Sequence, residues 1–163
     1  MTQQEFKLCF DKWFDEIRNY ISYRSFDPET ATDIVQETYM KLWEKNMEYR
    51  GSKTRSLLFK MASDLYVSNY RKQQTEKKHH NAFALTFDEH AVDVSVDDQE
   101  LVNRMRRALA ELPEKKRTVF LMNRMEGITY SNISKTLDIS VKTVEKRMSQ
   151  AIHTLRKLLK DES

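Results

Sequence analysis

The chain has 163 residues, of which 33% are charged, with a mean hydropathy of −0.75 and a formal net charge of +3. Gly and Pro occur only twice each and no clear run of alternating strand residues is present, which predicts an all-α protein. This length allows one ordinary domain or two small ones, and so polar a composition predicts a thin core divided among small helical units. No apolar run approaches the roughly 18 residues that a membrane span requires. The N-terminus lacks the layout of a signal peptide, and a single cysteine suits a reducing compartment, so we expect a cytoplasmic protein.

The charge is unevenly distributed along the chain. Residues 99–163 carry a net charge of +6, whereas residues 1–70 carry −1 and residues 71–98 carry −2. A basic module beside an acidic segment is compatible with contact to nucleic acid.

The first part of the chain is predicted to form three helices. The first spans about residues 5–25 and has an aromatic face, beside which Cys9 is expected to be a buried small residue. Asp27-Pro28-Glu29 is typical of a helix start and opens a helix over about residues 28–46. We expect that helix to bury Ala31, Ile34, Val35, Thr38, Tyr39 and Leu42 and to expose Asp33, Gln36, Glu37, Met40, Lys41 and Glu44.

A polar stretch over residues 49–55, broken at Gly51, precedes the third predicted helix, about residues 56–72. Basic and aromatic side chains gather here, as is common where proteins bind single-stranded nucleic acid: Tyr49, Arg50, Lys53, Arg55, Lys60, Tyr66, Tyr70, Arg71 and Lys72. Packing in the core is an equally good interpretation of Tyr66 and Tyr70.

Helical periodicity is lost over residues 73–98, which are polar and then acidic. We expect a linker that is extended or partly disordered. The even spacing of Val92, Val94 and Val96 suggests a short strand-like piece within it.

Residues 99–163 are predicted to be helical again. One helix covers about residues 99–111 and the next about 113–126, with Val119, Phe120, Leu121 and Met125 as core candidates and Gly127 at its end.

Residues 127–160 have the pattern of a helix-turn-helix, in which the second helix enters the major groove of DNA. Thr129 and Ser140 are placed to cap the two helices, and Asp138-Ile139 forms the turn between them. In the second helix an apolar stripe at steps of three and four must be buried. The polar residues beside it point outward, where they can contact phosphates and base edges: Ser140, Lys142, Thr143, Lys146, Arg147 and Gln150.

The sequence does not support an enzyme or a cofactor site. His79, His80, His90 and Cys9 do not have the spacing of metal ligands. Gly51 and Gly127 are the only glycines, so no phosphate-binding glycine loop is present, and no nucleophile with a base can be assembled.

Two separated segments resemble the same family. Residues 26–45, with Asp33-Ile34-Val35-Gln36-Glu37 and Leu42-Trp43, followed by residues 57–73, resemble the promoter-melting domain of bacterial sigma factors. Residues 108–159, with Leu112-Pro113, Glu126-Gly127 and the helix-turn-helix, resemble the domain that recognises the −35 element. Their order and spacing are similar to those of the extracytoplasmic-function type, which has only these two domains.

The resemblance implies a domain for polymerase binding and −10 melting over residues 1–72, a linker over 73–98 and a −35 domain over 99–163. It implies that Asp33, Gln36, Glu37, Met40 and Lys41 contact core RNA polymerase. It further implies that the loop at 49–55 captures a base flipped out of the non-template strand, and that a membrane-bound anti-sigma factor, at the inner membrane, controls the protein. Ser56 and Asp64 depart from the family pattern, in which Trp and Asn are common, and an acid at 64 would repel phosphate.

A second interpretation is a free-standing helix-turn-helix regulator, which would bind its DNA site without polymerase. In that case residues 1–72 would serve dimerisation or ligand binding.

Overall fold

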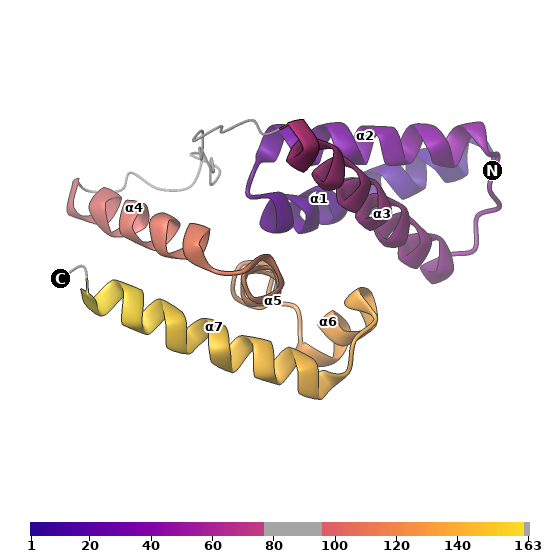
Figure 1. Ribbon diagram of the computed structural model, residues 1–163. Helices are drawn as coiled ribbons and strands as arrows, with labels where there is room; N and C mark the ends of the chain where they lie inside the picture. The colour runs from indigo at the N-terminus through magenta and orange to yellow at the C-terminus, as the bar shows by residue number, and fades with distance from the viewer. Residues whose placement is uncertain (77–95, 162–163) are drawn as a thin grey trace. The chain divides into compact units, whose positions relative to one another are not determined.

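The computed structural model describes residues 1–76 and 96–161, and all the regular structure in these two ranges is helical (Figure 1). The chain divides into two compact units, Met1–Ala84 and Leu85–Ser163. The all-α fold predicted from the composition is confirmed. Each unit is described by itself.

Unit 1 consists of three helices that pack against one another: α1 (Gln3–Ser25), α2 (Pro28–Glu44) and α3 (Ser52–Glu76). Thr2 and Glu5 form a capping box at the start of α1, and the Asp27 side chain accepts a hydrogen bond from the Glu29 N–H at the start of α2. These local bonds satisfy N–H groups that a helix start leaves without partners. The helix start predicted at Asp27-Pro28 is confirmed.

The core of unit 1 consists of the apolar faces of these helices. Cys9 is fully buried, as predicted, and all six residues expected to be buried on α2 are in the core. Burial of this apolar surface is the main source of stability for so polar a chain. The other fully buried side chains include Ile17, Ile21, Leu58 and Ala62.

The aromatic face of α1 is only partly buried. Phe6 packs edge-on against Trp43 with ring centroids 5.1 Å apart, and Phe10 packs against Tyr39 at 5.3 Å. Phe10 and Trp43 are nevertheless 41% and 48% exposed. The rings therefore form an apolar rim along the α1–α2 contact.

The third helix begins at Ser52, earlier than the predicted Ser56. Gly51 adopts a positive φ of 55°, which costs glycine little, and its carbonyl accepts hydrogen bonds from the N–H groups of Thr54 and Arg55. The Thr54 hydroxyl in turn accepts a bond of 2.7 Å from the Arg50 N–H. Half of the predicted loop at 49–55 is therefore the first turn of α3.

Unit 2 contains α4 (Val96–Glu111), α5 (Glu114–Arg124), α6 (Tyr130–Leu137) and α7 (Val141–Asp161). The long α7 packs against the other three helices. Both α3 and α4 extend into the segment predicted as a linker, and Val96 is helical. Val92 and Val94 of the predicted strand-like piece lie outside the described residues.

The core of unit 2 includes Val119, Phe120 and Leu121, as predicted. Met125, also predicted to be buried, is 54% exposed. It keeps the helical backbone, with its N–H bonded to the Leu121 carbonyl, but it is the C-cap of α5 and lies at the exposed end of that helix.

Two arginines bind carbonyl groups at helix ends in unit 2. Arg104 Nη2 donates to the Leu159 carbonyl near the end of α7 at 2.8 Å, and the buried Arg117 donates through Nη1 to the Leu112 carbonyl after α4 at 3.0 Å. A cation at a helix C-terminus satisfies carbonyls and interacts favourably with the helix dipole. Some of the basic residues of unit 2 are therefore structural.

Candidate nucleic-acid interface

The face of α2 opposite the core is polar. Asp33, Gln36, Glu37 and Met40 are exposed, and Lys41 is half-buried beside them. Lys41 Nζ lies 3.0 Å from Glu37 Oε1 in a surface ion pair. The structure thus places all five residues predicted to bind polymerase on one helix face. The half-exposed Trp43, which belongs to the aromatic rim, lies at the end of this face.

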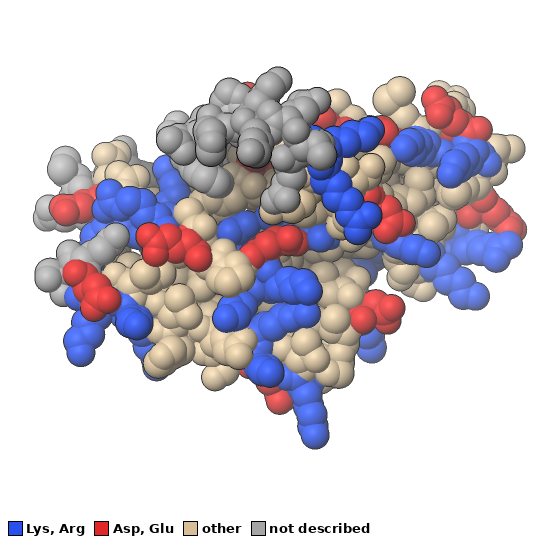
Figure 2. All heavy atoms as spheres, in the orientation of Figure 1, with Lys and Arg blue, Asp and Glu red and all other residues tan. Residues whose placement is uncertain are grey.

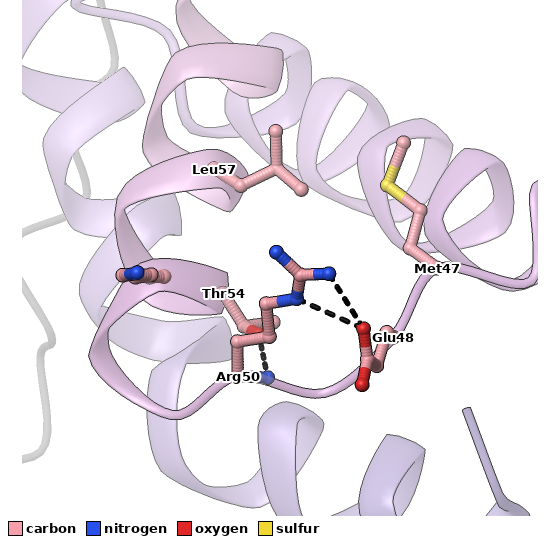
Figure 3. A pocket seen from close by; sticks show the side chains of 6 residues that line it. Met47, Glu48, Arg50, Thr54 and Leu57 are labelled. Atoms are coloured by element: carbon pink, nitrogen blue, oxygen red, sulfur yellow. Dashed lines mark hydrogen bonds and ion pairs between the residues drawn. The ribbon is translucent and has the colours of Figure 1, made fainter.

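A pocket of about 380 Å³ opens where the α2–α3 loop meets the start of α3 (Figure 3). Arg50 and Lys53 were singled out from the sequence, whereas Glu48, which also lines the pocket, was not. Arg50 donates to Glu48 Oε2 from both Nε (2.9 Å) and Nη2 (2.7 Å). The complete lining is Met47, Glu48, Arg50, Lys53, Thr54 and Leu57.

One face of α3 continues from the pocket. Lys53, Lys60, Asp64 and Arg71 are exposed and recur at intervals of seven, four and seven residues, which places them in line along the helix. Three cations in a line can follow a phosphate backbone. The acidic Asp64 lies between Lys60 and Arg71 in this line.

Besides Arg50, which is bonded to Glu48, one arginine and three tyrosines predicted to contact the −10 strand have contacts within unit 1. Arg55 forms an ion pair with Glu16 of α1 and lies over the Phe59 ring at 4.7 Å. Tyr66 is only 6% exposed, which corresponds to the core-packing interpretation. Tyr49 is half-buried and stacks on Trp13, with ring centroids 6.4 Å apart, and the half-exposed Tyr70 lies beside the Tyr66 ring at 6.2 Å.

The Tyr66 ring belongs to a small cation–π cluster with Arg24. The guanidinium carbon of Arg24 lies 4.5 Å from the Tyr66 centroid and 5.6 Å from that of Tyr20. Arg24 also donates to the Ser63 hydroxyl at 2.7 Å, which joins α1 to α3. The contacts of Arg24 with Ser63 and Tyr66 span 39 and 42 residues of sequence, so no local pattern could have indicated them.

The helix-turn-helix of unit 2 forms as predicted. Thr129 caps α6 by accepting a bond from the Asn132 N–H, and Ser140 accepts one of 3.1 Å from the Thr143 N–H at the start of α7. Between the helices, Asp138 adopts a left-handed φ of 54°, and its N–H and that of Ile139 both donate to the Ser134 carbonyl. The turn is therefore closed by backbone bonds, as in a helix C-cap.

The long helix α7 has two distinct faces. Val144, Met148, Ala151 and Leu155 are buried, as the apolar stripe predicted. Lys142, Lys146 and Gln150 are exposed, Thr143 and Arg147 are half-buried, and the hydroxyls of Ser140 and Thr143 lie 2.8 Å apart. In the view of Figure 2, basic and acidic side chains are mixed over the visible face.

Two groups in the core of unit 1 have shifted pKa values. Burial raises the pKa of the Tyr39 hydroxyl well above its usual value of 10.0, and burial likewise raises the pKa of the Cys9 thiol. Both groups are therefore neutral at physiological pH, and Tyr39 acts as a hydrogen-bond donor.

In residues 1–76 and 96–161, no His, Cys, Asp and Glu side chains are grouped to hold a metal ion. His79, His80 and His90 fall outside these ranges. Among the described helices, none has a long enough apolar segment to span a bilayer.

Two family models match the chain, Sigma-70 region 2 over residues 9–76 and Sigma-70, region 4 over residues 103–155. The RNA polymerase sigma factor YlaC of Bacillus subtilis (strain 168) is 26% identical over 156 residues, which cover 91% of this chain and 88% of YlaC. The ECF RNA polymerase sigma factor SigX of the same organism is 24% identical, over 98% of this chain and 88% of SigX.

The fold is also found in a solved structure, the co-crystal structure of the sigma factor RpoE in complex with the anti-sigma factor NepR from Bartonella quintana. The two chains have a TM-score of 0.71 and 22% identity, over 96% of this chain and 98% of that one. The fold, the order of the two family matches and the relatives, which align with most of the chain, all indicate the same family. The chain belongs to the extracytoplasmic-function sigma factors of RNA polymerase.

Proposed function

We propose that unit 1 binds core RNA polymerase and the melted −10 strand, while unit 2 recognises the −35 element. The observation that carries the proposal is the pairing of two surfaces in one chain, a pocket with a basic helix face in unit 1 and a helix-turn-helix in unit 2. The protein supplies binding and specificity, whereas polymerase supplies the chemistry. Such a subunit acts in the cytoplasm.

The exposed face of α2 is proposed as the polymerase contact. Its acidic and amide groups surround Met40, which is 59% exposed, and Trp43 extends the apolar part. An apolar centre with a polar rim is the usual composition of a protein interface. The opposite face of α2 is in the core, so the orientation of these side chains is fixed by packing.

The pocket and the basic face of α3 are proposed as the site for the non-template strand. A base that leaves the duplex stack loses stacking energy, and a preformed pocket offsets part of that loss. Lys53, Lys60 and Arg71 would neutralise phosphates next to it. Arg55 and Tyr66 are left out of this surface because Glu16 and the core occupy them.

The exposed face of α7 is proposed to enter the major groove. Lys142, Lys146 and Gln150 are exposed on its first turns, where recognition helices contact bases. Ser140 and Thr143 are bonded to each other, which favours a capping role with phosphate contact over the direct recognition of a base.

An anti-sigma factor is proposed as a further partner. The RpoE protein that shares this fold was crystallised with the anti-sigma factor NepR. The half-exposed aromatic rim of α1 and α2 offers apolar surface to such a partner.

Transcription with purified core polymerase on a randomised promoter library tests the proposal. We expect transcripts only when the chain is added, from templates that share two motifs at a fixed spacing. A free-standing regulator would instead select one motif, usually palindromic, in the absence of polymerase. Selection without polymerase and no stimulated transcription would reject the proposal in favour of that alternative.

A further inference from the structure

The sulfur atoms of the chain differ widely in their accessibility. The sulfur-containing side chains are one cysteine and eight methionines, and all of them lie within the described residues. Oxidants attack sulfur where it is accessible, and they attack cysteine mainly in its thiolate form. Cys9 is fully buried, and burial raises the pKa of its thiol, so little thiolate forms. The cysteine is therefore protected, and the exposed methionines are the accessible sites.

Two of the methionines are mostly exposed. Met40 on α2 is 59% exposed, and Met125 at the end of α5 is 54% exposed. Met122 and Met148 are buried in the core of unit 2. Because the oxidation of methionine follows its exposure, Met40 and Met125 should react first and the buried pair last. The remaining four have intermediate exposure: Met1, Met47, Met61 and Met105.

Met40 lies in the middle of the polar face of α2. Gln36 and Glu37 lie one helical turn before it, and Trp43 and Glu44 lie one turn after it. Its thioether is the apolar group that these polar side chains surround. The centre of a protein interface is usually apolar and excludes water. Met40 therefore occupies the position where a change from apolar to polar would disturb such an interface most.

We propose that Met40 is an oxidation site through which peroxide weakens polymerase binding, an inference that rests on the proposed role of the α2 face. The Met40 sulfur gives an electron pair to one oxygen of hydrogen peroxide and forms an S–O bond. The O–O bond breaks, and the second oxygen leaves as water. The sulfur is oxidised by two electrons and the peroxide is reduced. A neutral oxidant suits this site, since Glu37 and Glu44 repel anionic ones.

The product differs from the thioether in its polarity. A sulfoxide is polar, and its oxygen accepts hydrogen bonds. In the dry centre of the interface this oxygen would lose its hydration without gaining a donor, which is costly. Oxidised chain should therefore stay free of polymerase. Methionine sulfoxide reductases return the sulfoxide to the thioether, so the effect is reversible.

The test uses the full chain and core polymerase. The chain is treated with hydrogen peroxide until peptide mapping by mass spectrometry shows that Met40 is converted while Met122 and Met148 are intact. Catalase then removes the peroxide, and binding to core polymerase is titrated. We expect the oxidised wild type to bind about tenfold more weakly, as for one unpaired polar group. Treatment with reductases for both sulfoxide epimers should restore the affinity.

Three variants assign the effect to one sulfur atom. Met40→Leu conserves the apolar volume without sulfur, so it should bind like the wild type before and after peroxide. Met40→Gln places a polar side chain at the same site and should bind weakly without any peroxide. Met125→Leu is the matched control, since it removes the other exposed sulfur, and it should lose affinity on oxidation as the wild type does. A loss of affinity in oxidised Met40→Leu as large as in the wild type would overturn the assignment.

Oxidation of assembled holoenzyme tests the α2 contact separately. If polymerase covers this face, Met40 should be oxidised severalfold more slowly in holoenzyme than in the free chain. Slower oxidation in holoenzyme, combined with unchanged affinity of the oxidised chain, would overturn the oxidation effect and still support the α2 contact. Equal rates in the two samples would overturn the α2 contact and the inference together.

Discussion

The hydroxyl of Tyr39 donates a hydrogen bond of 2.9 Å to the backbone carbonyl of Cys9, 30 residues earlier in the chain. The bond is buried and joins α2 to α1 at the centre of unit 1. It fixes the rotation of α2 about its axis. The polar face with Asp33 and Gln36 is thereby held away from the core.

Tyr39→Phe should destabilise unit 1 by roughly 1 kcal/mol at neutral pH, because one buried hydrogen bond is lost. Burial raises the pKa of Tyr39 above 10.0, so the hydroxyl favours folding only while it is protonated. The advantage of the wild type over the variant is full below pH 10.0 and shrinks as the pH rises further. Urea denaturation of both proteins at neutral and alkaline pH measures the difference. A difference in the free energy of unfolding that stays constant across this pH range would contradict the buried hydrogen bond.

Reversal of charge at Asp33 and Glu37 tests the α2 face. Both side chains are exposed, so Asp33→Lys/Glu37→Lys should fold normally. Binding to core polymerase should weaken by about 2 kcal/mol. An acidic face pairs with a basic surface, and the two new lysines would repel that surface. Titration of labelled protein with core polymerase gives the affinity.

The control for this face is Asp11→Lys/Asp15→Lys, which makes the same change of charge at two exposed acids of α1. It should bind core polymerase like the wild type. Equal affinities for all three proteins would remove α2 from the interface.

Asp64→Asn should strengthen binding to the melted strand. Asp64 lies in line with Lys53, Lys60 and Arg71, so it repels the phosphates that they attract. Neutralising it should tighten binding of single-stranded DNA to holoenzyme by about 0.5–1 kcal/mol at low salt, and by less at high salt.

Fluorescence anisotropy at about 50 and 200 mM salt measures this change. Asp15→Asn, the same substitution at an exposed position on α1, should have no effect. If Asp64→Asn left the affinity unchanged at both salt concentrations, the α3 face would not lie along the strand.

Local chemistry explains which features could be predicted from the sequence. Thr129 and Ser140 cap helices through bonds to residues three positions away, so their role was visible in a short stretch of sequence. The buried faces of α2 and α7 follow from helical periodicity. The helix-turn-helix was predicted nearly to the residue for these reasons.

Contacts between distant segments explain what could not be predicted. Arg55 looked like a DNA contact, but its partner Glu16 lies 39 residues earlier, on α1. The burial of Tyr66 depends on packing against α1, and the early start of α3 depends on the backbone of Gly51. Glu48 carried no signal of its own, because its place in the pocket lining depends on how the loop meets the start of α3.

The recognition helix gives the final prediction. Lys142 and Lys146 lie on the exposed face of the first turns of α7, and Arg147 is half-buried at its edge. Alanine at a residue that contacts a base should cost about 1–3 kcal/mol and relax the preference at one position of the −35 element. Alanine at a residue that contacts phosphate should weaken binding to all promoters alike and lower the salt slope by about 1.

Lys157→Ala is the control, since Lys157 is exposed on the same helix but lies fifteen residues, or about 22 Å, beyond Lys142. Only the first turns of a recognition helix reach the bases, so this variant should keep both the sequence preference and the salt slope. Binding of holoenzyme to a −35 library at several salt concentrations measures both quantities. Because Lys157→Ala and the three test variants each remove one positive charge, total charge cannot account for a difference between them. If all four variants behaved alike, α7 would not be the helix that enters the groove.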